Sequence, residues 1–181
     1  KPDSCLSTFL QKGSPPLYIG FGSLSLDTMQ DLVKILSQST EHLGIRALLS
    51  LEKKLLHEVP LPPHIYLTPH IPHHLLFRHV CAVVHHGGAG VTHAGLKAGK
   101  PTLVCPFSAD QPFWGRRVAM LGCGPTPLPL RKITIKSLTQ RLDQLIHTPA
   151  YRKNAEKLSE KMQKEIGVKN AADIIVAGIK K

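Results

Sequence analysis

Aromatic residues and long apolar runs are both scarce in this chain of 181 residues. Phe, Trp and Tyr make up 5% of the sequence, and they do not alternate with basic residues. Proteins usually hold single-stranded nucleic acids by stacking the bases on such aromatic side chains, so we expect no nucleic acid partner. No apolar run approaches the length of a membrane span. The opening KPDSCLSTFL has too short an apolar stretch for a secretory signal peptide.

Cysteines are few, and their spacing suggests no pairs. The four of them, Cys5, Cys81, Cys105 and Cys123, have no spacing typical of zinc or redox sites. Cys81 and Cys105 fall in strands that we predict to be buried, where a cysteine usually packs as a small apolar residue. These features together favour a reducing, cytoplasmic setting.

Acidic residues are outnumbered by basic ones, 12 against 23, which gives a formal net charge of +11. Residues 131–181 hold 12 Lys or Arg against 5 Asp or Glu, a balance of +7, and the preceding part holds the remaining +4. Such an excess suits anionic partners, including nucleotides and acidic lipid headgroups, so peripheral membrane contact stays open. A solvated helical face would produce the same charge pattern.

Histidines are crowded into one part of the chain, with nine of the 11 between His57 and His93. Metal sites in proteins favour set spacings with acidic or cysteine partners. His70, His73 and His74 have no carboxylate near them in the sequence. We therefore expect no metal.

The apolar pattern predicts one α/β domain. Hydrophobic residues make up 42% of the chain, enough for a sizeable core. Residues 1–16 are mostly polar, end in Ser-Pro-Pro and are interpreted as a linker, which leaves residues 17–181 as the domain. Short apolar runs alternate with segments of helical periodicity, as in a doubly wound parallel sheet. We predict strands at 17–21, 45–49, 65–67, 80–84 and 102–105, and helices at 27–42, 89–98, 112–121, 135–145, 151–162 and 171–179.

Residues 83–117 combine a strand end, a glycine turn, a helix start and a second strand end. The glycines let the backbone approach a ligand closely, and the first amides of the helix lack partners, so this turn suits a phosphate or diphosphate. His86 can donate one more hydrogen bond, and Asp110 with Gln111 offers acceptors and donors for sugar hydroxyls. A glycine turn that serves packing alone would fit the glycines equally well.

Three motifs in order carry a resemblance to a known family, HHGGAG at residues 85–90, AG-x-P at 98–101 and PF-x-x-DQPFWG at 106–115, and PLYIGFGSLS at 16–25 matches the start of the same domain. Together they resemble the donor-binding signature of nucleotide-sugar glycosyltransferases of the GT-B fold, most of all the sterol 3-beta-glucosyltransferases. The likeness spans nearly the whole chain. It implies the Rossmann-like C-terminal half of a GT-B fold, which binds a nucleotide sugar at the carboxyl edge of its sheet.

The resemblance also implies a role for each matching residue. The base of the nucleotide would rest on the loop with Ile71 and His73, and the sugar would be held by Asp110 and Gln111. The residues implied for the donor diphosphate are Gly22, Ser23, His86, Gly88, Ala89, Gly90 and Thr92. One departure stands among them, because the family usually has Thr-Thr or Ser-Thr after the GGAG stretch and this chain has Val91 before Thr92.

The function implied by the resemblance is transfer of glucose from UDP-glucose to a lipid-like hydroxyl, such as that of a sterol. The chain would need the UDP-sugar as donor and no cofactor. In GT-B enzymes an N-terminal domain binds the acceptor and carries the base, and nothing before Leu17 is long enough to be that domain. We therefore expect no catalytic residue in this chain, no transfer by the chain alone, and an acceptor-binding N-terminal domain as partner in cis or in trans.

Two other functions fit the same sequence. A nucleotide-sugar-binding module without transfer activity is favoured by Val91, and an interaction domain is favoured by the basic helical face. In GT-B enzymes the final helix commonly crosses back to the other domain, so part of the apolar face of residues 171–179 is expected to be bare.

Overall fold

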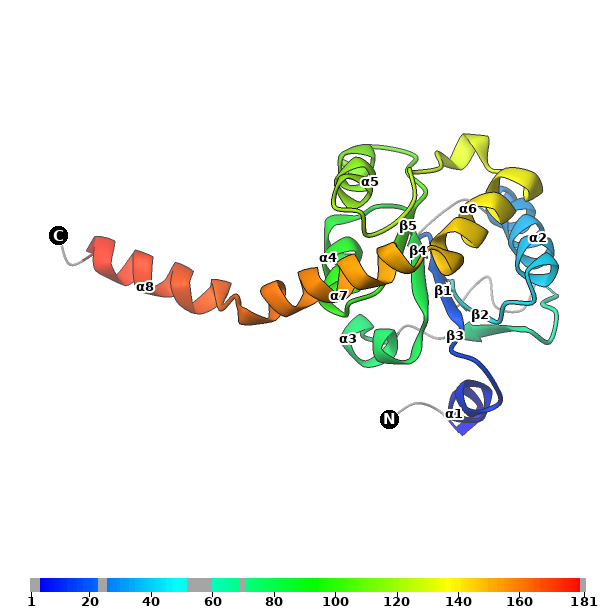
Figure 1. Ribbon diagram of the computed structural model, residues 1–181, viewed down its shortest axis with the longest axis horizontal. Coiled ribbons are helices and arrows are strands. Elements are labelled where there is room, and N and C mark those ends of the chain that lie inside the picture. The colour runs from blue at the N-terminus through cyan, green and yellow to red at the C-terminus, as the bar shows by residue number, and fades with distance from the viewer. Residues whose placement is uncertain (1–3, 23–25, 52–59, 69–70, 180–181) are drawn as a thin grey trace.

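A parallel β-sheet forms the centre of the molecule, which the computed structural model describes over residues 4–22, 26–51, 60–68 and 71–179 (Figure 1). In this described part the sheet has five strands in the order β3-β2-β1-β4-β5, and all neighbours are parallel. The strands are β1 (Leu17–Gly20), β2 (Ala47–Ser50), β3 (Ile65–Thr68), β4 (Ala82–His85) and β5 (Thr102–Val104). The predicted strands are confirmed, with ends that shift by at most two residues.

Helices cover both faces of the sheet, which confirms the doubly wound α/β fold (Figure 1). On one face α2 (Leu26–His42) packs against α6 (Ile135–His147), and on the other α4 (Ala89–Lys97) packs against α7 (Pro149–Lys164). The remaining helices are α1 (Ser4–Gln11), α3 (His73–Leu76), α5 (Gln111–Met120) and α8 (Gly167–Ile179), with the 3-10 turns η2 (Phe77–His79) and η3 (Leu130–Lys132).

Strand β1 illustrates how the sequence builds these layers. Alternate side chains of a strand point to opposite faces, so Leu17 and Ile19 join the core under α2 and α6, while Tyr18 packs with Phe77 on the other face. Because both faces are covered by helices, the strand is apolar along its whole length.

The chain changes direction across the sheet at the boundary between β1 and β4. β1 pairs with β2 on one side and with β4 on the other, so the loops after β1 and β4 leave the sheet next to each other. Ligands of doubly wound folds bind at such a switch point, at the carboxyl ends of the strands. The two glycine-containing turns of the sequence meet there.

The segment interpreted as a linker contains a helix, which the sequence analysis did not predict. In α1, Leu6 is fully buried among the residues that pack under α3. Arg46 lies 4.2 Å from the centre of the Phe9 ring, and its guanidinium donates to the carbonyl oxygens of Phe9 and Ser14. Residues 4–11 are therefore an ordered part of the domain surface.

The last helix, α8, extends away from the sheet (Figure 1). Its described side chains are exposed, and they include Ile174, Ile175 and Val176 at 73%, 61% and 52% of their full accessible surface. The bare apolar face expected for residues 171–179 is thus observed, although the helix starts earlier, at Gly167. None of the helices in the described ranges is long and apolar enough to cross a bilayer.

Candidate donor-binding site

Three strands end at the carboxyl edge of the sheet, and their loops form the candidate site. The register places Gly20 of β1 beside His85 of β4, and His85 beside Val104 of β5. The loops that follow contain Gly22, the turn 86–88 and the segment 106–110. Residues that are far apart in the sequence are therefore brought to one edge, as predicted from the motifs.

The turn after β4 depends on a glycine at position 87. Gly87 has a φ of +102°, and an added Cβ would lie 2.7 Å from Cγ1 of Val104 and 3.0 Å from the carbonyl oxygen of Gln111. Only glycine combines this φ with so close an approach to the next strand and to α5. Part of the glycine pattern is thus explained by packing, which was the alternative interpretation of the sequence.

His85, the last residue of β4, also stabilises this turn. It is fully buried, and its Nδ1 accepts a hydrogen bond of 2.8 Å from the amide of Gly87. Burial lowers the pKa of His85 to about 3, and the neighbouring rings of His86 and His73 add to this effect. The imidazole is therefore neutral, with its proton on Nε2, which is buried without a partner among the described residues.

His86, by contrast, is only half-buried and lies between the two glycine turns. A Cβ on Gly88 would come within 2.8 Å of its Nε2, and a Cβ on Gly22, whose φ is +66°, within 3.4 Å of its Cε1. Burial lowers the pKa of His86, while the backbone of Gly20 and the carboxylate of Asp110 act in the opposite direction. A neutral ring still donates one hydrogen bond, so His86 can meet an anion without bringing a charge.

The start of α4 faces the same space. Its N-cap, Gly88, has no side chain to occupy the first amides of the helix, and Ala89 and Gly90 are exposed. A Cβ built on Gly90 would meet nothing within 4 Å. Free amides at an open helix start are a favourable place for a phosphate.

Thr92 lies one turn into α4 and is 1% exposed. Its hydroxyl donates to the carbonyl oxygen of Gly88 at 2.8 Å, and its amide donates to the same oxygen at 3.0 Å. In this placement Thr92 holds the turn in shape, and its direct contact with a diphosphate stays a prediction. Val91 is half-buried and packs against the core under α3.

The loop between β5 and α5 carries the two residues predicted to hold the sugar. Gln111 is 8% exposed, and its Oε1 accepts hydrogen bonds from the amides of Phe107 at 2.9 Å and Ser108 at 3.1 Å. The carboxylate of Asp110 is exposed and accepts a 2.8 Å hydrogen bond from the indole of Trp114. Asp110 is thus presented to solvent at the site, whereas half of the Gln111 amide is already used by the loop.

The two residues predicted to contact the base lie on the α3 side of the site. Ile71 packs against the core there, and the His73 ring stacks on Phe77 with centroids 4.7 Å apart. Nε2 of His73 also lies 3.3 Å from the hydroxyl of Tyr18. The side chain of His73 is therefore engaged with its neighbours, and contact of Ile71 and His73 with a base stays a prediction.

The remaining sequence predictions concern Ser23 and a bound metal ion. Ser23, predicted to contact the diphosphate, lies outside the described residues. Within those residues, no group of three or more His, Cys, Asp or Glu side chains is arranged to hold a metal ion.

The comparison with known families decides what kind of domain this is. Residues 41–177 match the family model described as Erythromycin biosynthesis protein CIII-like, C-terminal domain. The chain belongs to this family of glycosyltransferase domains, the EryCIII-like domains.

Curated relatives of the EryCIII-like domain include several sterol 3-beta-glucosyltransferases. It is 37% identical over 172 residues to sterol 3-beta-glucosyltransferase UGT80A2 of Arabidopsis thaliana, covering 94% of this chain and 27% of the relative. It is 35% identical over 187 residues to the sterol 3-beta-glucosyltransferase of Candida albicans, covering 97% and 12% respectively. The chain therefore spans about a quarter or less of the length of these relatives.

Solved structures show the same fold. The calicheamicin glycosyltransferase CalG4 matches with a TM-score of 0.76 and 22% identity over 94% of this chain and 43% of its own. The spinosyn rhamnosyltransferase SpnG, in complex with thymidine diphosphate, matches with a TM-score of 0.72 and 22% identity over 83% and 42%. The EryCIII-like domain is the C-terminal half of a GT-B fold, as predicted.

Sequence reasoning missed two residues of the EryCIII-like domain that shape its site. One feature of the sequence could have indicated the role of His85: it is a polar residue at the end of a buried strand, close before the glycine turn that it holds. Trp114 was not among the predicted site residues, although it follows Asp110 by four residues, a spacing that brings two side chains together at the start of a helix.

Proposed function

We propose that the EryCIII-like domain is the donor-binding half of an enzyme that transfers glucose from UDP-glucose to a sterol-like hydroxyl. The observation that carries the proposal is the position of His86, between two glycine turns and beside the open start of α4. Asp110 lies on the adjacent loop and contributes electrostatically to the pKa of His86, so a diphosphate and its sugar can be held side by side. The sterol and the glucose are supported by the names of the curated relatives.

The diphosphate end of the site supplies the chemistry. Direct displacement at the anomeric carbon leaves negative charge on the departing UDP. Hydrogen-bond donors that are already in place can stabilise that charge without reorganisation. His86 and the first amides of α4 provide such donors, and Gly22 leaves room for the phosphates between the two turns.

The sugar end would work through hydrogen bonds. The Asp110 carboxylate accepts from hydroxyl groups, and the Trp114 indole holds it in place. Gln111 would use its Nε2, since its Oε1 is bound to the loop backbone and Nε2 has only a 3.5 Å contact with the Ser108 hydroxyl. Two oriented groups of this kind would select a hydroxyl pattern and hold the anomeric carbon in line.

Calorimetric titration of the 181-residue chain tests the donor site. We expect binding of UDP and UDP-glucose, with modest affinity because only one wall of the cleft is provided by this chain. ADP serves as a control for nonspecific attraction to the basic surface. No heat with UDP at about millimolar concentration, or equal binding of UDP and ADP, would contradict a uridine-nucleotide site.

A transfer assay tests the division of labour. A base must lie within hydrogen-bond reach of the acceptor hydroxyl, and we propose that the acceptor-binding half of the enzyme supplies it. With radiolabelled UDP-glucose and a sterol, the chain alone should give no product, and addition of the upstream half in cis or in trans should restore transfer. Robust turnover by the chain alone would place a base within it, with His73 and His93 the first to replace.

Val91 favours a second candidate, a module that binds nucleotide sugars without supporting transfer. Its side chain carries no hydroxyl and is turned partly into the core, so one donor to the diphosphate is lost. Under this alternative the chain binds UDP-glucose, but no transfer appears even when the acceptor-binding half is present.

A further inference from the structure

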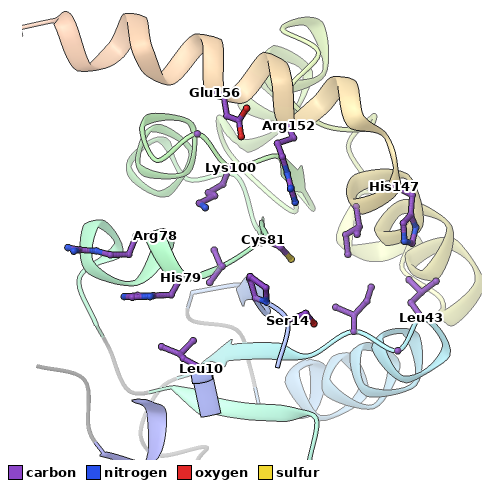
Figure 2. Close-up of a pocket in the computed structure, with 16 residues that line it drawn as sticks. Leu10, Ser14, Leu43, Arg78, His79, Cys81, Lys100, His147, Arg152 and Glu156 are labelled. Atoms are coloured by element: carbon purple, nitrogen blue, oxygen red, sulfur yellow. The ribbon is translucent and has the colours of Figure 1, made fainter. Parts of the chain in front are cut away.

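A cavity of about 720 Å³ lies at the amino-terminal edge of the sheet, opposite the edge that carries the candidate donor site (Figure 2). Cys81 and Lys100, which line it, come just before β4 and β5, whereas the donor site follows the ends of these strands. Four residues of β4 span about 13 Å, so the two sites are separated by the length of the strands. A cavity of this size can enclose a small organic molecule.

Cations dominate the charged lining. Arg78, Lys100 and Arg152 stand against one carboxylate, Glu156. Figure 2 shows Arg152 extending from α7 towards Cys81, with Lys100 beside it, whereas the guanidinium of Arg78 points away from these residues. Neither Lys100 nor Arg152 forms an ion pair or a side-chain hydrogen bond within the described part of the chain.

These two cations are close enough to disfavour each other. Burial lowers the pKa of Lys100, and the neighbouring guanidinium of Arg152 lowers it further, while Cys81 and Glu156 act in the opposite direction. Of the histidines that line the cavity, His147 is bound to Asp143 at 2.8 Å. An anion between Lys100 and Arg152 would relieve the repulsion.

The carboxyl ends of α2 and α4 lie next to the cavity, but they do not explain why Lys100 and Arg152 are there. Helix carboxyl ends attract positive side chains, because their last carbonyl groups lack partners. Here the amides of Gly44 and Ile45 donate to carbonyls in the last turn of α2, and those of Gly99 and Lys100 to carbonyls in the last turn of α4. The glycine turns already satisfy these carbonyls.

The other wall of the cavity is apolar. It is formed by Leu10 of α1, Leu43 and Ile45 after α2, and Ile146 of α6. A simple inorganic anion would leave this wall in contact with water. A ligand with an apolar part would cover it, and each buried CH₂ group contributes about 0.8 kcal/mol.

We propose that this cavity binds a phosphate monoester that carries an apolar chain. The phosphate lies between Lys100 and Arg152, and the chain lies along Leu10, Leu43 and Ile146. This site is separate from the donor site and does not depend on the function proposed for it. The same headgroup chemistry is found in soluble alkyl phosphates and in lipids such as phosphatidic acid.

Titration of the full chain with inorganic, ethyl, butyl and hexyl phosphate tests both halves of the proposal. Affinity should rise with chain length, by about two- to four-fold per CH₂ if the chain is buried. Lys100→Met and Arg152→Met should each weaken hexyl phosphate about ten-fold or more, as expected for a lost charge-assisted hydrogen bond. Lys157→Met, on the exposed side of α7, removes the same charge outside the cavity and should change little.

Alkylation of Cys81, which lines the cavity, shows at alkaline pH whether the ligand binds there. Hexyl phosphate should slow this reaction, followed by mass spectrometry, and should leave the exposed thiol of Cys5 unaffected. Thermal unfolding of each variant separates loss of binding from loss of fold. Affinity independent of chain length, an equal loss in Lys157→Met, or unprotected Cys81 overturns the proposal.

Vesicles distinguish the two sources of the ligand. Lys100-dependent binding to phosphatidylcholine vesicles that contain phosphatidic acid, but not to phosphatidylcholine alone, would identify a membrane lipid. Binding of hexyl phosphate without vesicle binding would identify a soluble phosphate monoester. Both results support the cavity as the site, and absence of both overturns it.

Discussion

Under the proposed function, His86 and Asp110 lie on two neighbouring loops and bind different parts of a nucleotide sugar. His86 lies at the glycine turns and the start of α4, where phosphate is expected, while Asp110 is held by Trp114 on the loop after β5. His86→Ala should therefore weaken UDP and UDP-glucose alike. Asp110→Ala should weaken UDP-glucose and leave UDP nearly unchanged. Each loss is expected to be several-fold by calorimetry, since a hydrogen bond contributes about 0.5–1.5 kcal/mol.

Two variants sharpen this comparison. Trp114→Phe keeps an aromatic side chain but removes the donor to Asp110, so it should reproduce a smaller form of the Asp110→Ala effect. Glu160→Ala, an exposed carboxylate on α7, controls for the change in net charge. If Asp110→Ala weakened both ligands equally, the assignment of Asp110 to the sugar would be wrong.

His85 makes the stability of the domain sensitive to acid. Its pKa is about 3 in the folded chain, against an ordinary 6.5, so below pH 6.5 the unfolded chain binds a proton that the folded chain does not. Acid therefore favours unfolding, and this contribution is lost as the pH falls from 6.5 towards 3. The slope approaches about 1.4 kcal/mol per pH unit, and denaturant unfolding between about pH 7 and pH 5 should reveal it.

His85→Asn provides the matched comparison. The Asn oxygen can replace Nδ1 as the acceptor for the Gly87 amide, but it does not titrate. The variant should be less stable at neutral pH, because the smaller side chain leaves a cavity, and its stability should fall less between about pH 7 and pH 5. A variant with the same acid dependence as the original chain would exclude His85 as the cause.

At the scale of elements, replacement by alanine should weaken UDP binding at one glycine near the start of α4 and raise stability at another. Gly88→Ala puts a Cβ 2.8 Å from Nε2 of His86, so the ring must move and UDP binding should fall. Gly90→Ala meets no atom within 4 Å and adds a better helix former, so it should raise the free energy of unfolding by up to about 1 kcal/mol. Calorimetry and denaturant unfolding measure the two effects. If Gly88→Ala bound UDP and unfolded as the original chain does, the position of His86 would not depend on the close approach of Gly88.

The helices and strands of the core were predictable because the lengths of the apolar runs and the positions of the glycines indicated the same boundaries. Apolar runs such as 17–20 and 82–84 have the length of buried strands, and Gly99 stops α4 with a φ of +67°. The helix α1 was not predicted, because four apolar residues among polar ones do not distinguish a helix from a linker when the packing of Leu6 in the folded domain is not known.

The site was predictable in its location but not in its contacts. Sequence order places residues 86 and 110 at strand ends, and parallel pairing brings them to one edge. The use of Gln111 Oε1 by the loop backbone, and of the Thr92 hydroxyl by Gly88, depends on the conformation of each loop. Such hydrogen bonds are set by backbone geometry that residue types alone do not specify.

At the scale of the whole molecule, α8 stands apart from the domain core. Its described side chains are exposed, so truncation after Lys164 should change the free energy of unfolding by less than about 0.5 kcal/mol. It should also reduce self-association in sedimentation, because the exposed Ile174, Ile175 and Val176 would be removed. Leu158→Ala, in the part of α7 that packs on the core, should instead cost about 2 kcal/mol or more. A large loss on truncation would show that α8 is part of the folded unit.

The pairing of β1 with β4 also has a consequence for biosynthesis. β1, β2 and β3 emerge from the ribosome first, and they can form one half of the sheet with the β1 edge still open. Unpaired strand edges are prone to wrong associations during folding. That edge stays open until β4 has been translated, so a chaperone or rapid elongation would have most effect in this interval. Of the strand edges that later pair within the sheet, the β1 edge waits longest for its partner, and the two glycine turns meet beside it.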